Sequence, residues 1–273
     1  MPKTSARLSP RRRPGYQALA LATWFILPAG CAHLGPAERQ ALIQANEMYA
    51  RDQTSAAVAR LDRLISDFDQ APEIAEAYYL RGLCRTRKGE LQAAREDFKR
   101  AIDRSKRADL TARCRASLAA IAFREGDWLE AANLYEEALD GLPVQPPSDE
   151  IRFSAGVAAQ RAGRWKDAAI HFARLLREFR DRPLAADARR MAAWRHEYFA
   201  IQLGAYQDAA NAEKTVSTYK ARGLPQVVVQ HLPRGGQSLW VVMAGQYATY
   251  SKALAALPRV RGVEPNAHII PQP

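Results

Sequence analysis

The side chains with the most versatile chemistry in this 273-residue chain are its five histidines, which could act as metal ligands or as general acids and bases. None has a second histidine, a cysteine or a glutamate at a spacing that would complete a metal site. The chain also has no glycine-rich phosphate loop and no Gly-x-Ser-x-Gly nucleophile motif. We therefore expect no metal, no cofactor and no nucleophilic catalysis. The five isolated histidines are His33, His171, His196, His231 and His268.

The acidic residues near the C-terminus offer little more for catalysis. Hydrolysis of a glycosidic bond usually needs two carboxylates on either side of that bond. After residue 197 the only acids are Asp208, Glu213 and Glu264, and the first two lie on or next to a predicted helix, behind the predicted sheet. The sequence favours a binding protein over an enzyme.

Composition indicates a globular protein with an ordinary charge balance, since 48% of residues are apolar and 25% are charged. Five of the 11 net positive charges belong to the first 13 residues, so removal of a leader would leave +6 (11 − 5). The remaining basic residues are interspersed with acids. This distribution argues against nucleic acid as a partner.

The N-terminus has the three parts of an export signal: a basic stretch through Arg13, an apolar run over residues 16–27, and the small pair Ala29-Gly30. The apolar run is shorter than the roughly 20 residues of a membrane-spanning helix. Residues 27–31 resemble a bacterial lipobox, although Pro28 stands where an aliphatic residue is usual. The resemblance implies a signal peptide over residues 1–30, lipidation of Cys31, and a membrane-anchored protein on the periplasmic side, with the outer membrane favoured. Ordinary signal-peptidase cleavage near Ala32 and an uncleaved anchor are the alternatives.

Two further cysteines, Cys84 and Cys114, fall in helical patterns without metal-binding spacing. Small buried thiols explain them. A disulfide between them is the alternative in an oxidising compartment, but sequence does not set their separation.

The middle of the chain repeats with a period of 37 residues, marked by glycines at 89, 126 and 163 (126 − 89 = 163 − 126 = 37). One step earlier stands Asp52, flanked by matching residues, so we expect four helical hairpins. Each glycine is followed by a small residue, an aromatic residue and an apolar residue, and is preceded by a further small residue. At the offsets +5, +9, +12 and −7 these are Ala94, Ala131, Ala168; Phe98, Tyr135, Phe172; Ala101, Ala138, Leu175; and Gly82, Ala119, Gly156.

These residue types and spacings resemble the tetratricopeptide repeat (TPR) family, with a period three residues longer than its usual 34. We assign residues 31–36 to an anchor or linker and residues 37–197 to the array, which a helix over residues 184–197 caps. The resemblance implies a concave face that recruits a protein partner, still unidentified; a simple spacer is the alternative. Trp128 and Trp165 occupy equivalent repeat positions, which favours packing over a ligand cage.

Near the C-terminus the sequence motif of residues 201–206 recurs at residues 242–247, with its glycines and tyrosines 41 positions apart (245 − 204 = 247 − 206 = 41). In each copy a strand-like run meets a glycine, which we expect to turn the chain into a helix. The surrounding pattern predicts the order βαββαβ, with the second helix ending at Pro258 and with both helices on one face of a four-stranded sheet, the other face being open. The fold class expected for the whole chain is an all-α repeat array followed by this small α+β domain.

The repeated motif, together with Gly223-Leu224-Pro225 and the hairpin of residues 233–237, closely resembles the SPOR domain, over residues 198–273. The resemblance implies binding of peptidoglycan, in particular of glycan strands from which amidases have removed the stem peptides, often at the division septum. The first copy would contribute Gln202, whose amide alternates with Ile201 and Leu203 and so points to the open face. Its small neighbour Ala205 corresponds to a groove position of the family.

On the third strand we expect further glycan contacts from a short list of residues. Trp240 is the aromatic candidate for stacking on a sugar ring, with an edge-of-core role equally open, and Tyr206 and Tyr247 are expected to be core aromatics beneath the turns. The remaining candidates are Leu239, Val241, Met243 and Gln246.

Two functions remain open at this point. One is a non-catalytic envelope protein that binds peptidoglycan through its C-terminal domain and recruits a partner through its repeats. The other is an envelope-assembly or secretion adapter, in which the repeats carry the function and the C-terminal domain only positions them.

Overall fold

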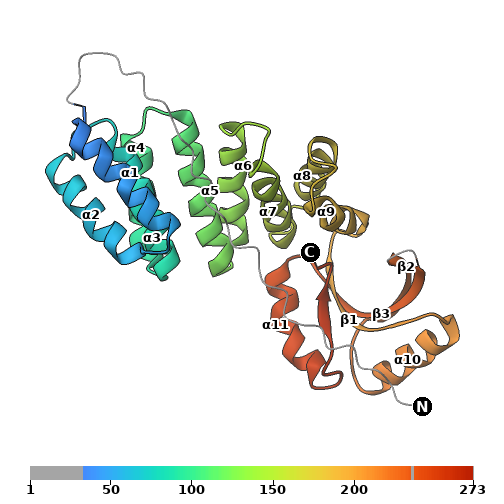
Figure 1. The fold of residues 1–273 in the computed structure, drawn as a ribbon. Helices are drawn as coiled ribbons and strands as arrows, with labels where there is room; N and C mark the ends of the chain where they lie inside the picture. The colour runs from blue at the N-terminus through green and yellow to red at the C-terminus, as the bar shows by residue number, and fades with distance from the viewer. Residues whose placement is uncertain (1–32, 235–236, 273) are drawn as a thin grey trace.

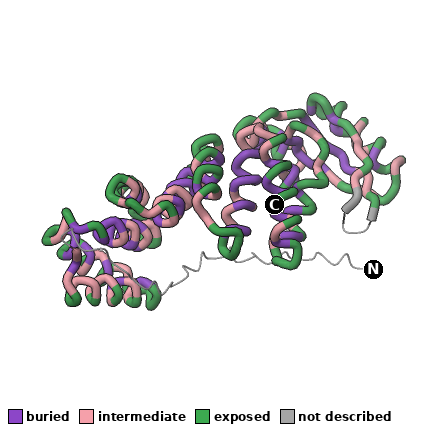
Figure 2. Tube along the Cα trace, turned by 90° about the horizontal axis from the view of Figure 1, so that it is seen from above, coloured by how far each residue is buried: buried purple, intermediate pink, exposed green. Residues whose placement is uncertain are grey.

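The structure is a computed structural model that describes residues 33–234 and 237–272 (Figure 1). The predicted signal peptide, Cys31 and the two glycines of the predicted hairpin, Gly235 and Gly236, lie outside these residues. Within them a run of helical hairpins leads into a small sheet domain, which lies beneath the last helices of the array in Figure 1. Seen from above in Figure 2, the array extends to one side of the sheet domain, and both parts contain buried positions.

The helical part consists of four hairpins and one additional helix, as the 37-residue period predicts. Each hairpin packs on the next. The helices are α1 Pro36–Ala50, α2 Thr54–Asp67, α3 Ile74–Lys88, α4 Leu91–Arg104, α5 Ala108–Glu125, α6 Trp128–Asp140, α7 Ser148–Arg161, α8 Trp165–Glu178 and α9 Leu184–Ala193.

The turn inside each hairpin requires a left-handed residue, and this requirement explains the periodic glycines. Gly89, Gly126 and Gly163 have φ angles of 82°, 87° and 86°. Asp52 takes the equivalent place in the first hairpin with φ 62°, a conformation that aspartate tolerates better than most residues. The alignment of Asp52 with the three glycines is thereby confirmed.

A second periodic glycine lets the two helices of a hairpin approach closely. A Cβ atom added to Gly82 would lie 2.7 Å from the ring of Phe98, and one added to Gly156 would lie 2.7 Å from the ring of Phe172. Both rings are almost fully buried. The aromatic residue of one helix therefore fills the space that the glycine of the other leaves free.

The C-terminal domain has the predicted βαββαβ order and one four-stranded sheet. The spatial order is β2-β3-β1-β4, and all neighbouring strands are antiparallel. Its elements are β1 Phe199–Tyr206, α10 Ala209–Ala221, β2 Val227–Arg234, β3 Gln237–Tyr247, α11 Tyr250–Arg261 and β4 His268–Ile270.

We expected each of the doubled glycines to turn the chain from a strand into a helix. The structure corrects this prediction, because both glycines lie inside the strands. β1 and β3 continue through Tyr206 and Tyr247. Gly204 adjoins a register shift between β1 and β3, and Gly245 has a φ of 73°. Each glycine also lies under the ring of the tyrosine two residues later, where a side chain would collide with that ring. The repeated Gly-x-Tyr is thus a strand irregularity covered by an aromatic ring.

Two helix ends differ from the sequence prediction. The helix α9 stops at Ala193 rather than at residue 197, and Trp194 is already extended. The helix α11 continues through Pro258 to Arg261. Proline removes one helical hydrogen bond there, but Leu254, whose carbonyl would accept it, is 50% exposed, so water can hydrate that carbonyl.

Cys84 and Cys114 are free thiols, each buried within the array. Burial raises the pKa of Cys84 to about 11 and that of Cys114 to about 12. Both behave as small apolar core residues rather than as a disulfide pair.

Candidate functional site

The two faces of the sheet have different surroundings. One face packs on α10 and α11 through a cluster that includes Ile201, Leu203 and Val242. The opposite face, called here the outer face, carries a second, smaller cluster that includes Val241 and Met243. Gln202 alternates with Ile201 and Leu203, so it lies on the outer face, as the sequence predicts.

Strand register brings the main candidates together on the outer face. Gln202 of β1 lies opposite Met243 of β3 and, on its other side, opposite His268 of β4. Ala205 lies opposite Val241 in the same ladder and is exposed. The Gln202 side chain is nearly buried, with 7% of the residue exposed. An amide in this setting is held in place by its neighbours.

The outer face is partly covered rather than open, which corrects the sequence prediction. Ala200 and Met243 are fully buried, and Val241 is 2% exposed. The cover comes from Trp194 and Tyr198, in the segment between α9 and β1. Because α9 ends early, this segment is extended and can lie against the sheet instead of continuing the helix.

Trp240, the aromatic candidate for stacking, belongs to the other side of the sheet. It lies opposite Tyr206 in the β1–β3 ladder, and both pack against the cluster beneath α10 and α11. Its ring centroid lies 4.6 Å from that of His231, its partner on β2, with the two ring planes tilted by 34°. The sheet therefore separates Trp240 from Gln202, whereas Leu239 lies on the outer face.

Gln246 is exposed, but it is far along the ladder from Ala205. In the antiparallel pair, Tyr247 lies opposite Phe199 at one end and Trp240 lies opposite Tyr206 at the other. Gln246 and Ala205 are thus at opposite ends of the two strands. The structure brings together Gln202, Val241 and Met243 and leaves Gln246 apart.

Asp208 and Glu264, two acids of the sheet domain, have structural partners. Asp208 caps α10 by accepting a hydrogen bond from the backbone N–H of Ala210 at 3.1 Å. Glu264 accepts a hydrogen bond from the Tyr219 hydroxyl at 2.6 Å. Burial first, and this bond to a carboxylate second, raise the pKa of Tyr219 to about 12. These contacts fasten α10 to the loop before β4 and assemble no carboxylate pair.

An aromatic group on the outer face was missed in the sequence. Trp194, His196 and Tyr198 lie one after another in the segment before β1, with ring centroids 5.0 Å apart for the first pair and 4.9 Å apart for the second. Their two-residue spacing continues the alternation of Ala200 and Gln202. That alternation was the available signal, but the helical pattern predicts a capping helix over residues 184–197, which takes in Trp194 and His196 and leaves only Tyr198 to the sheet domain.

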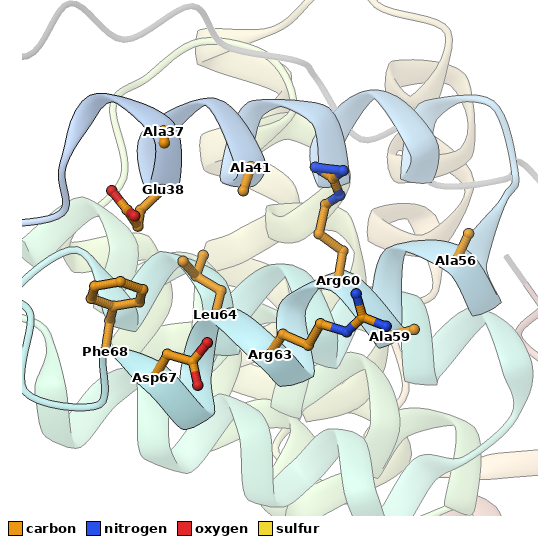
Figure 3. Close-up of a pocket in the computed structure, with 10 residues that line it drawn as sticks. All are labelled: Ala37, Glu38, Ala41, Ala56, Ala59, Arg60, Arg63, Leu64, Asp67 and Phe68. Atoms are coloured by element: carbon orange, nitrogen blue, oxygen red, sulfur yellow. The ribbon is translucent and has the colours of Figure 1, made fainter.

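A hollow of about 480 Å³ lies in the array, between the first two helices (Figure 3). Figure 3 shows alanines of both helices and Arg60 around it, together with Arg63 and Asp67. None of the candidate binding residues lines this hollow. In the described part of the chain no three His, Cys, Asp or Glu side chains meet as a metal site.

None of the helices in residues 33–234 and 237–272 combines the length and the apolar character needed to cross a bilayer.

Comparison with protein families divides the chain as the repeats and strands do. A tetratricopeptide repeat model matches residues 73–143, a second such model matches residues 116–183, and the SPOR domain model matches residues 196–271. No curated protein matches the chain.

Several solved structures resemble part of the chain. A tetratricopeptide repeat protein from Parabacteroides merdae is 14% identical, with a TM-score of 0.50, and the match covers 70% of this chain and 68% of that one. YrrB, described as a TPR protein with an unusual peptide-binding site, is 21% identical over 56% of this chain and 73% of its own, with a TM-score of 0.47. PilF of Pseudomonas aeruginosa is 15% identical over 84% and 93%, with a TM-score of 0.46.

The SPOR domain is a peptidoglycan-binding module, and tetratricopeptide repeats mediate protein–protein interactions; neither is a catalytic domain. The chain thus carries tetratricopeptide repeats over residues 73–183, followed by a C-terminal SPOR domain over residues 196–271.

Proposed function

We propose that this protein is a non-catalytic component of the bacterial cell envelope that binds glycan strands of peptidoglycan through the outer face of its sheet. The match of residues 196–271 to the SPOR domain carries the proposal. The position of Gln202 supports it, because an amide between Met243 and His268 can donate to and accept from sugar hydroxyl and acetamido groups.

The character of the outer face favours glycan without stem peptides. From Val228 to Leu232 on β2, and along β1 and β4, its described side chains are apolar, amide or imidazole groups. Stem peptides carry carboxylate and ammonium groups, which would lie on this surface without charged partners. Denuded strands suit the face better, and we place the encounter with them at the division septum.

The repeats supply the second half of the proposal. We assign them the recruitment of a protein partner on their concave face, so that the chain links this partner to the cell wall. Cys31 would hold the assembly at the membrane through a lipid. Replacement of Cys31 by serine should then move the protein from the membrane fraction to the soluble fraction; unchanged membrane association would exclude the lipid anchor.

Cosedimentation of the full chain with purified sacculi, before and after amidase treatment, tests glycan binding. We expect the bound fraction to increase after the amidase removes stem peptides and to disappear when a muramidase then digests the strands. No cosedimentation with either preparation would reject the proposal and leave the adapter function of the repeats.

A pair of glutamine variants tests the chosen face. Gln202→Ala should weaken binding to amidase-treated sacculi about tenfold, as expected for loss of one or two hydrogen bonds of about 1 kcal/mol each. Gln207→Ala, at an exposed position just after β1, is the matched control. Equal binding by both variants would spare the domain assignment but reject the outer face as the site.

A further inference from the structure

The segment that joins the array to the sheet presents three rings in one cluster. The rings of His196 and Tyr198 are nearly parallel, with centroids 4.9 Å apart and planes 27° apart. Trp194 meets both edge to face, at 5.0 Å from His196 and 6.1 Å from Tyr198. All three residues are half-buried, so each keeps part of its surface in contact with solvent.

Hydrogen bonds and apolar packing fix this segment on the outer face. The Trp194 indole N–H donates to the Tyr198 carbonyl at 2.9 Å, which closes the segment on itself. The Gln230 amide donates to the Tyr198 hydroxyl at 3.1 Å, which ties the segment to β2. Trp194 and Tyr198 also cover Ala200 and Met243, both fully buried. Lifting the segment would expose these apolar groups, so it is a fixed part of the surface rather than a lid.

Polar groups beside the rings have hydrogen-bonding capacity left. The Nε2 atom of Gln230 donates to the Tyr198 hydroxyl, while its Oε1 atom is buried without a hydrogen-bond partner among the described residues. The Tyr198 hydroxyl accepts that bond and keeps its own proton to donate. Exposed ring surface therefore adjoins a hydroxyl and an amide.

This combination fits a carbohydrate better than a purely apolar ligand. The C–H groups on one side of a pyranose ring form an apolar surface that packs on an aromatic ring, while the hydroxyl and acetamido groups around its edge need hydrogen-bond partners. Tyr198 and Gln202 lie on the same face, separated in the alternation by the small Ala200. A strand of linked sugars could thus extend from Gln202 to the three rings.

We propose that Trp194, His196 and Tyr198 form a stacking platform for one sugar ring of the glycan strand. The proposal rests on the proposed function and adds a part of the site that lies outside the strands of the sheet. The aromatic contact thereby comes from the segment before β1 and not from Trp240.

Two histidine variants of the full chain provide a matched test. His196→Ala should weaken binding to amidase-treated sacculi about 3- to 10-fold, the range expected for loss of one aromatic contact. The control is His231→Ala, which removes an imidazole in contact with a tryptophan, Trp240, on the helix-covered side of the sheet. This control should bind like the wild type.

Trp194→Ala should weaken binding at least as much as His196→Ala. Trp194→Phe, which keeps a ring in place, guards against misfolding and should retain most of the binding. Wild-type binding by His196→Ala and Trp194→Ala would overturn the proposal of a stacking platform. Tighter binding by these variants would also overturn it, because the rings would then cover the glycan site instead of forming part of it. Failure of the wild type to bind either sacculus preparation would instead reject the proposed function itself.

Discussion

The guanidinium carbon of Arg161, at the end of α7, lies 4.5 Å from the centroid of the Tyr250 ring, at the start of α11. This contact joins the repeat array to the sheet domain. The same guanidinium lies 4.6 Å from the ring centroid of Trp128, and Trp165 of the array packs at 4.8 Å on Phe199 of β1. The two periodic tryptophans are packing residues, as the sequence predicts, but they pack at the domain junction.

Replacement of Arg161 by alanine should loosen this junction. Burial lowers the pKa of Arg161, and a Coulombic interaction with Tyr250 offsets part of that effect. The faces of three aromatic rings attract the guanidinium in this buried setting. Loss of about 1–2 kcal/mol would increase the open population about 5- to 30-fold. Trypsin cleavage after the exposed Arg195, between the two domains, should accelerate accordingly.

The control for this experiment is Arg124→Ala, which removes an exposed arginine from α5. It should leave the cleavage rate unchanged. Equal rates for the two variants would show that Arg161 does not hold the domains together.

Gly82→Ala should destabilise the array by about 1–3 kcal/mol, because the new methyl group would collide with the fully buried ring of Phe98. The urea midpoint measures the effect. Adding Phe98→Leu should recover part of the loss, since the smaller side chain relieves the collision. If the double variant were less stable than the sum of the two single changes, close packing would not be the reason for the glycine.

The thiols of Cys84 and Cys114 should resist alkylation in the native protein at pH 8. Burial raises the pKa of both far above that pH, so neither is ionised or accessible. In a chain with Cys31→Ser, mass spectrometry should find no label in buffer and two labels in urea. Rapid native labelling, or a mass 2 Da lower from a disulfide, would contradict the structure.

The stability of the array should decrease as the pH is lowered, partly because of His171. Burial, the largest effect, lowers the pKa of His171, and its Nδ1 atom is buried without a hydrogen-bond partner in the described chain. The unfolded chain then binds a proton that the folded chain excludes, so the contribution is complete above about pH 6.5 and declines as the pH drops below it.

His171→Leu should flatten this dependence. Leucine occupies the corresponding place in the preceding repeat, at Leu134 (134 − 126 = 171 − 163 = 8), so the fold accommodates it. Melting temperatures at pH 7.5 and pH 5.5 should differ less in the variant than in the wild type. An equal difference in both proteins would assign the pH dependence to the carboxylates instead.

The repeat array was predictable because its constraints are local. A left-handed turn needs glycine or a tolerant residue such as Asp52, and a close helix pair needs a small residue such as Gly82 opposite Phe98. These demands recur every 37 residues in the sequence itself. Because side chains alternate along a strand, the sequence likewise placed Gln202 on the face of the sheet opposite to Ile201 and Leu203.

The position of Trp240 was not predictable to the same degree. Alternation along β3 puts Trp240 in phase with the core residue Val242, but as the aromatic candidate for a sugar ring it could equally be assigned to the other face, so the sequence left the choice open. Only the paired strands show that it lies with Tyr206 beneath the helices.

The sequence by itself determined the repeats, the order of the strands and the face of the sheet on which each side chain of β1 lies, since each depends on residues close together in the chain. Tertiary structure decided what covers the outer face and how the domains meet. Trp194 and Tyr198 lie on the sheet because α9 stops at Ala193, and Arg161 meets Tyr250, which lies 89 positions later in the chain (250 − 161 = 89). Contacts between distant segments depend on the packing of whole elements, which no local pattern encodes.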